Sequence, residues 1–326
     1  MTFGAAGIRR LAVTAQAAAA LGIGAALVRL AGWSWPGALA AGVAMILGGF
    51  AAGIAFAFAF TGRGLWVASG HRPPAPPQEL AATRRPLRVP EALRCYLNEI
   101  RSVLRMFDWL QPFRARAPFA PPADALPGRD APPVLLVHGY ACGQAIWLDM
   151  QPALAAAGYR CEGIDLLPVF GDIDDYAHAL LGAMRRVTAD YGRAPLLVCH
   201  SMGGLVARAA LRLAGDEDLC AGIVTLGTPH HGSALARFGG GHNARQMRCG
   251  SLWLSALASA ESPRLRARMV SVFSWHDSIA GPPCTGWLEG AGHIALSGIG
   301  HVSLLRHPAA IRAVLDALRE LSARGR

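Results

Sequence analysis

Residues 196–211, LLVCHSMGGLVARAAL, change character in the middle of the stretch. A short apolar run ends in the polar pair His200 and Ser201, and two glycines, Gly203 and Gly204, then lead into a run rich in Ala, Leu and Arg. The first half is typical of a buried strand and the second half of a helix. The chain therefore leaves a strand through a serine and enters a helix over glycines.

A serine at such a turn is typical of a nucleophile elbow. Small residues flank Ser201 two positions away on each side, with Cys199 in place of the first glycine of the G-x-S-x-G pattern. The helix that follows directs its N-terminal N–H groups at the serine oxygen, which favours negative charge developing there. We therefore predict that Ser201 is a nucleophile and that the backbone N–H of Met202 belongs to an oxyanion hole.

The stretch VLLVHGY at 134–140 predicts the other half of that hole. It reads as an apolar strand that runs into His138 and Gly139, and the loop after this strand supplies the second N–H donor in such sites. We expect that donor to be Tyr140, with Gly139 allowing the backbone to turn toward the reacting carbon. The alternative is an ordinary strand-to-helix turn, which would explain Gly139 but explains His138 less well.

Two later loops carry the remaining candidates. In SVFSWHDSIAGPP, 271–283, Asp277 follows a strand, and in GIGHVSLLRHP, 298–308, His301 lies in a glycine-flanked loop. The order Ser201, Asp277, His301 is the one expected of α/β-hydrolases. In this scheme His301 takes the serine proton, and Asp277 fixes the ring's tautomer.

Other histidines compete for the role of base. His293 opens a predicted strand, and His307 precedes the proline that starts the terminal helix. We expect the side chain of His200 to point away from the cleft, across the turn. The sequence therefore favours His301.

Composition points to a globular protein with a membrane segment. Apolar residues make up 53% of the 326 residues and charged residues 16%, which excludes a disordered chain. The mean hydropathy of +0.32 indicates a membrane segment. The net charge of +10 comes from arginine alone, and no basic run alternates with aromatic residues. We expect no nucleic-acid partner, and instead an attraction to anionic lipid headgroups.

From residue 134 onward, predicted strands and helices alternate. This alternation predicts an α/β fold, a mostly parallel sheet with helices on both faces. The expected strands are 133–138, 159–165, 194–199, 220–226, 268–274 and 293–297, and the expected helices are 144–156, 174–190, 203–214 and 308–322.

Two uncharged apolar runs, 11–28 and 36–60, lie near the N-terminus. The second is long enough to cross a hydrocarbon core of about 30 Å as a helix. Two tryptophans in the connection, 31–37, suit a membrane interface. A secretory signal is the alternative for the first run. Because a second run follows at once, we predict an all-α transmembrane hairpin over 1–62.

Arginines flank the hairpin on both sides, which bears on its orientation. They are Arg9, Arg10, Arg63, Arg72, Arg84 and Arg85. The positive-inside rule then places both ends, and the C-terminal domain, on the cytoplasmic side of a bacterial inner membrane. A single-span anchor would instead place the domain on the periplasmic face.

Residues 63–130 read as a linker with one amphipathic helix at 90–111. Proline-rich stretches at 71–90 and 118–133 flank this helix, and its apolar positions recur at helical spacing: Leu93, Leu97, Ile100, Leu104, Phe107 and Leu110. The helix either docks on the catalytic domain or lies on the bilayer surface. The catalytic domain is expected over 131–326.

Together the motifs VLLVHGY, CHSMGGL, GTPHHGS (227–233) and GIGHVSLL resemble those of bacterial triacylglycerol lipases and related serine esterases. The resemblance spans about residues 130–326. It implies an α/β-hydrolase fold, a triad of Ser201, Asp277 and His301, and hydrolysis of carboxylic esters. It also implies a lid-like segment at 230–262, for which a plain helical excursion is the alternative.

Metals and cofactors are not predicted, and the sequence leaves the disulfide state of the cysteines open. Ser303 stands where secreted relatives often carry a calcium-binding aspartate, so no calcium site is carried over. Residues 172–175, DIDD, fit a capped first helical turn better than a metal site. The seven cysteines show no metal-site spacing, although Cys249 and Cys284 could pair in an oxidising compartment.

The sequence thus predicts a membrane-anchored serine hydrolase without cofactor, acting on a lipid or another apolar ester through an acyl-enzyme. An acyltransferase or thioesterase would use the same residues. A non-catalytic lipid-binding scaffold is the alternative from a different class.

Overall fold

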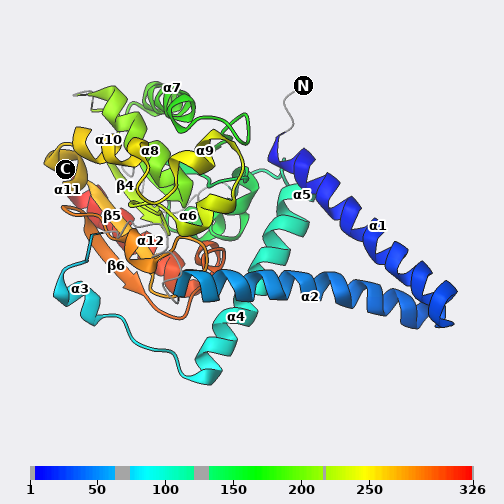
Figure 1. Ribbon diagram of the computed structural model, residues 1–326. Coiled ribbons are helices and arrows are strands. Elements are labelled where there is room, and N and C mark those ends of the chain that lie inside the picture. The colour runs from blue at the N-terminus through cyan, green and yellow to red at the C-terminus, as the bar shows by residue number, and fades with distance from the viewer. Residues whose placement is uncertain (1–3, 63–73, 121–131, 216–217, 325–326) are drawn as a thin grey trace.

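The computed structural model describes residues 4–62, 74–120, 132–215 and 218–324 (Figure 1). Its centre is a six-stranded sheet in the order β2-β1-β3-β4-β5-β6, and every neighbouring pair is parallel. The strands are β1 Val134–Val137, β2 Cys161–Ile164, β3 Leu196–His200, β4 Gly222–Leu226, β5 Met269–Ser274 and β6 Gly292–Leu296. All six predicted strands are present, and the predicted α/β class is confirmed.

The helices cover both faces of this sheet. Side chains alternate along each strand, so Leu136 and Val198 belong to one buried cluster whereas Val137 and Cys199 belong to the other. On the first face lie α6 Gln151–Ala156 and α12 Pro308–Arg324, and on the second lie α7 Ile173–Tyr191, α8 Met202–Ala214 and α10 Leu252–Ala260. Because the strands are parallel, their carboxyl ends meet at one edge of the sheet.

One predicted helix differs from the expectation. Residues 144–156 form a 3-10 helix, η3 Gln144–Asp149, followed by the separate helix α6. Pro152, in the first turn of α6, has no N–H to continue the preceding turn. Helix α7 begins as predicted, since the side chain of Asp172 accepts a hydrogen bond from the backbone N–H of Asp174 at 2.8 Å.

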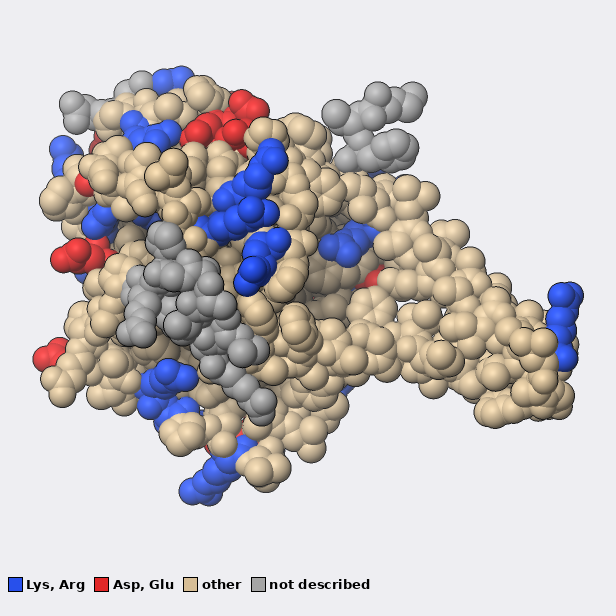
Figure 2. All heavy atoms as spheres, viewed as in Figure 1, with Lys and Arg blue, Asp and Glu red and all other residues tan. Residues whose placement is uncertain are grey.

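The N-terminal helices α1 Ala5–Ala31 and α2 Trp35–Gly62 form a hairpin that projects from the domain (Figure 1). Small residues line their contact, where Ala38 is fully buried and a side chain at Gly42 would overlap the backbone of Ala20. Both helices are long and apolar enough to cross a membrane, with mean hydropathies of 1.9 and 2.2. Only 11% of the most apolar 18-residue stretch of each helix is buried against the rest of the protein. Figure 2 shows that the projecting hairpin carries almost no charged side chains.

The base of the hairpin contacts residues 104–113. Arg10 Nε donates to the carbonyl of Pro112 at 2.7 Å, and the guanidinium of Arg9 lies 4.1 Å from the ring centre of Phe107. The expected domain boundaries near 63 and 131 lie outside the described residues, as do Arg63 and Arg72. Within the stretch 71–90 the structure adds a short helix, α3 Gln78–Ala82.

The predicted helix 90–111 is present as α4 Val89–Val103, continued by a π-helical turn, η2 Leu104–Leu110, and by α5 Gln111–Phe113. The sequence did not predict the orientation of α4. Leu93 and Leu97 of the apolar stripe are 54% and 47% exposed, whereas Glu99 and Ser102 are buried. At these positions the helix therefore presents apolar side chains outward and polar side chains to the domain.

Candidate active site

Ser201 lies between β3 and α8, at the carboxyl edge of the sheet. Its backbone has φ 54° and ψ −124°, a conformation that residues other than glycine rarely adopt. Three hydrogen bonds hold it there: its N–H donates to Leu226 O at 2.9 Å, and its carbonyl accepts from Thr228 Oγ1 at 2.8 Å and from the N–H of Gly204 at 3.1 Å. This is the strained turn that the sequence predicted.

Gly203 allows the elbow to approach the neighbouring strand. A Cβ at this position would lie 2.5 Å from the carbonyl oxygen of Val137 and 2.7 Å from that of His138. Both are backbone atoms, so the strand itself would have to move.

We expect Gly203→Ala to lower the free energy of unfolding by about 3 kcal/mol or more. Gly182→Ala in α7 is the matched control, because its Cβ would meet no atom within 4 Å. There alanine stabilises the helix by up to about 1 kcal/mol. Denaturant unfolding of both variants in detergent checks this, and equal stability of the two would contradict it.

The loop after β1 packs directly on Ser201. A Cβ on Gly139 would lie 2.9 Å from Ser201 Cβ. Among the described residues, neither the backbone N–H of Tyr140 nor that of Met202 donates a hydrogen bond. Within this part of the chain both N–H groups are therefore without an acceptor.

His138 fixes the conformation of this loop. It is buried, its Nε2 accepts from the N–H of Leu166 at 2.9 Å, and its Nδ1 lies 2.9 Å from Gly139 O. Burial lowers the pKa of His138, so the ring is neutral and suited to accept at one nitrogen and donate at the other. The histidine therefore joins the ends of β1 and β2.

Asp277 and His301 meet in the loops after β5 and β6. Asp277 Oδ2 lies 2.8 Å from His301 Nδ1, and both residues are 3% exposed. The other carboxylate oxygen accepts from the N–H groups of Ile279 and Ala280 at 2.8 and 2.7 Å. These bonds fix the carboxylate, and with it the ring plane of the histidine.

The electrostatics of this pair favour a protonated ring. Burial by itself would lower the pKa of His301, but the charge of Asp277, its hydrogen bond and the charge of Glu99 together raise that pKa above the ordinary 6.5. Such a site stabilises an imidazolium. Among the described residues no hydrogen bond joins His301 to the Ser201 hydroxyl.

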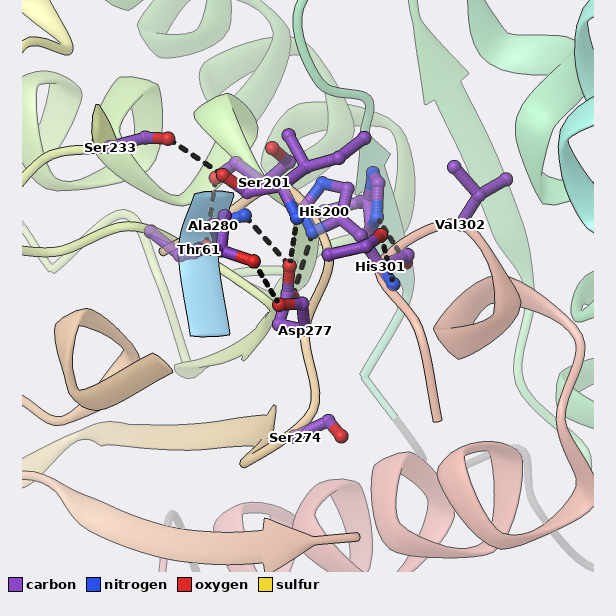
Figure 3. Close-up of polar contacts among 12 residues, drawn as sticks. Thr61, His200, Ser201, Ser233, Ser274, Asp277, Ala280, His301 and Val302 are labelled. Carbon is purple, nitrogen blue, oxygen red and sulfur yellow. Dashed lines mark hydrogen bonds and ion pairs between the residues drawn. The ribbon is translucent and has the colours of Figure 1, made fainter. Parts of the chain in front are cut away.

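The competing histidines have other partners. His293 Nε2 accepts from the N–H of Leu288 at 3.2 Å, and His307 Nδ1 accepts from that of Ala309 at 3.2 Å. The expectation for His200 was wrong: its ring centre lies 4.7 Å from that of His301, and its Nε2 is 3.3 Å from His301 O (Figure 3). Burial lowers its pKa well below 6.5, so it is a neutral neighbour that packs beside His301.

Sequence reasoning missed two contributions from the N-terminal segment. Thr61, at the end of α2, is buried beside Asp277: its Oγ1 donates to Ala57 O at 2.8 Å and lies 3.4 Å from the carbonyl oxygen of Asp277 (Figure 3). Glu99 of α4 reaches the loop of His301. Both residues lie far from the motifs in the sequence. The sequence offered one signal, for Glu99 alone, because it is a single acidic residue close to the apolar stripe of the predicted helix 90–111.

The predicted lid-like segment contains η4 Ala234–Phe238, α9 Gly241–Gln246 and α10. Its end is anchored by a buried ion pair in which Arg208 of α8 binds Glu261 at 2.5 and 2.8 Å. Its first part meets the N-terminal hairpin, where the ring of Phe238 lies 5.6 Å from that of Phe60. Tyr140 adds a third contact, because its hydroxyl donates to Gly240 O and accepts from Gly240 N.

Within the described parts of the chain, no group of three or more His, Cys, Asp or Glu side chains is placed to hold a metal. The seven cysteines, including Cys249 and Cys284, are free thiols.

Parts of this chain are similar to known proteins. Residues 179–282 match the family model of the PGAP1-like alpha/beta domain. Epoxide hydrolase B of Mycobacterium tuberculosis is 32% identical over 121 residues, 35% of this chain and 33% of the relative. The triacylglycerol lipase of Pseudarthrobacter phenanthrenivorans is 32% identical over 115 residues, 32% of this chain and 35% of the relative. The chain thus spans about a third of the length of these curated relatives.

A solved structure covers more of the chain. The mature form of Bacillus licheniformis lipase BlEst2 superposes with a TM-score of 0.52 and 20% identity over 62% of this chain and 95% of that protein. The chain has the α/β-hydrolase fold. The resemblance to lipases and esterases that the motifs indicated is confirmed.

Proposed function

We propose that the chain is a membrane-anchored serine hydrolase that cleaves carboxylic esters of lipids. The observation that carries this proposal is a strained serine at the carboxyl edge of the sheet, beside a buried imidazole–carboxylate pair with a 2.8 Å bond. The relatives named lipase, together with the fold, support the same class of reaction.

The reaction proceeds in two acyl-transfer steps. His301 Nε2 removes the proton of Ser201 as its oxygen attacks the ester carbonyl, and the same proton then passes to the leaving alcohol. Water attacks the resulting acyl-enzyme, and His301 again acts first as base and then as acid. The missing bond between Ser201 and His301 is compatible with this scheme, because catalytic hydrogen bonds often tighten only with substrate bound.

Each step passes through a tetrahedral oxyanion. The free N–H groups of Tyr140 and Met202 are the donors proposed to stabilise it. Asp277 holds the histidine tautomer that leaves Nε2 unprotonated, and it stabilises the imidazolium formed in each step.

An apolar substrate is supported by the surroundings of Asp277. A cavity of about 640 Å³ lies between the end of α2, the helix α4 and the Asp277 loop. Its walls include Phe58, Cys95 and Trp275. Ser201 and His301 do not line this cavity, so we propose it as an apolar space beside the triad, with one wall formed by the end of the helix that would lie in the bilayer. On the arginine pattern, we place the catalytic domain on the cytoplasmic face, and the periplasmic face remains the alternative arrangement.

An acyltransferase or a thioesterase differs only in the second nucleophile or the leaving group, so the same site would serve either. A lipid-binding scaffold would need neither the strained Ser201 nor the buried pair of Asp277 and His301.

Labelling with a fluorophosphonate probe tests the proposal. Because the probe reacts only with an activated serine, the full-length protein in detergent should be labelled, and Ser201→Ala should abolish the label. Ser259→Ala is the matched control, since Ser259 is exposed on α10. Absence of labelling in the folded wild-type protein, or undiminished labelling of Ser201→Ala, would refute a serine hydrolase.

A further inference from the structure

Glu99 is a buried carboxylate whose partners all belong to the loops of the proposed catalytic pair. It is 1% exposed. Its Oε1 accepts from Ser278 Oγ at 2.8 Å and from the N–H of Val302 at 2.9 Å, and its Oε2 accepts from the N–H of Ser303 at 2.9 Å. Ser278 follows Asp277 directly, and the other two residues follow His301. One side chain of α4 thus joins the two loops.

The loop is shaped around this carboxylate. A Cβ at Gly300, the residue before His301, would overlap the carboxyl group of Glu99. Ser278 Oγ also accepts from the N–H of His301 at 3.4 Å, so a chain of two hydrogen bonds runs from Glu99 to the histidine backbone. A second contact from α4 reinforces the first, because Ser303 Oγ donates to Ser102 Oγ at 3.1 Å.

A helix ordinarily buries its apolar face. Helix α4 is instead oriented so that the polar side chain of Glu99 contacts the domain. Leu93 and Leu97 stay exposed so that Glu99 and Ser102 face inward. A buried carboxylate is costly unless it is hydrogen-bonded, and charge-assisted bonds of 2.8–2.9 Å from three donors offset that cost.

We propose that Glu99 is a positioning residue for catalysis: its carboxylate holds the loop that carries His301 and adds a second negative charge beneath the imidazolium. The inference rests on the proposed function. It assigns part of the catalytic machinery to α4, which lies outside the predicted catalytic domain 131–326.

The same helix is joined to the membrane hairpin. Tyr96, one turn before Glu99, donates its hydroxyl proton to the carbonyl of Ala51 in α2 at 2.6 Å. Helix α4 therefore contacts the hairpin and the His301 loop through neighbouring positions.

The pH dependence of kcat/KM separates this role from a merely structural one. The base must be neutral to accept the serine proton, so activity falls as pH drops through the pKa of His301, which lies above 6.5. Among the described residues, the charged and titratable groups that act on the ring are Asp277 from the loop after β5, Glu99 from α4 through its charge, and the neutral His200 from β3, which packs against the ring. Removing the charge of Glu99 therefore moves the acid limb to lower pH.

The experiment measures hydrolysis of p-nitrophenyl butyrate by full-length variants in detergent across the acid limb. For Glu99→Gln we expect kcat to fall roughly ten- to a hundredfold, with KM little changed, because hydrogen bonds to a buried charge are lost. The acid limb should shift to lower pH at the same time. Glu99→Asp keeps the charge on a shorter stem, so kcat should fall while the limb stays near that of the wild-type protein.

Glu91→Gln is the matched control on the same helix. Glu91 bonds to the backbone N–H of Arg88 and to Arg85 near the surface, and glutamine also suits this capping position. It should leave kcat and the acid limb unchanged.

The outcomes that overturn the inference are distinct from those that refute the hydrolase. Wild-type kcat in a folded Glu99→Gln protein, or a lower kcat with an unmoved acid limb, would exclude the positioning role. If Glu99→Gln does not fold, wild-type kcat in Glu99→Asp excludes it instead. Failure of the proposed function shows differently, as an unlabelled and inactive wild-type protein.

Discussion

Replacing His301 by alanine is expected to lower kcat for ester hydrolysis by about 10⁵- to 10⁶-fold, the cost of removing the base from a serine triad. The Ser201 hydroxyl and its oxyanion donors stay in place, but no group removes the proton or returns it to the leaving alcohol. Fluorophosphonate labelling should slow in parallel, because the probe depends on the same activation. Steady-state hydrolysis of p-nitrophenyl butyrate and the rate of labelling measure the two effects.

His307→Ala is the control for this variant, since His307 is engaged at the start of α12 and lies outside the proposed triad. Its kcat should match that of the wild-type protein. A loss in His307→Ala comparable to that in His301→Ala would mean that His301 is not the base.

Asp277→Asn is expected to lower kcat by about 10⁴-fold. The carboxylate of Asp277 accepts on both oxygens, from the backbone N–H groups of Ile279 and Ala280 on one and from His301 on the other. An asparagine that keeps its oxygen toward the backbone turns its NH₂ group toward His301 Nδ1. That nitrogen must then accept, so the ring proton moves to Nε2, where it blocks proton removal from Ser201.

This tautomer effect has a recognisable pattern. The variant should keep its fold, and the residual rate should rise with pH as hydroxide replaces the general base. Asp175→Asn, in the first turn of α7, is the matched change and should retain full activity. A rate within tenfold of wild type for folded Asp277→Asn would show that Asp277 does not orient the base.

The sheet and its loops were predictable because parallel strands buried on both faces leave continuous apolar runs in the sequence. Residues 134–137 and 196–199 are such runs, and the residues that follow them had to meet at one edge. The glycines of the elbow added a signal for close backbone approach, and the structure places atoms of Val137 and His138 there.

Helical periodicity did not predict which face of α4 meets the domain. The spacing of Leu93 and Leu97 indicates an apolar face, but it does not say whether protein or lipid covers that face. The decision depends on donors contributed by residues about 200 positions away, the N–H groups of Val302 and Ser303. The position of His200 was missed for a similar reason, since the ring of His301 that it packs against comes from a distant loop.

Helix α4 also defines where an anchor-free version of the enzyme could begin. A chain that began at the first residue of β1 would keep every motif named in the sequence. It would lack Glu99, however, whose carboxylate accepts hydrogen bonds from Ser278, Val302 and Ser303. A fragment for crystallisation or directed evolution that keeps these three bonds therefore starts no later than Val89, and its exposed leucines are the natural positions for polar replacement.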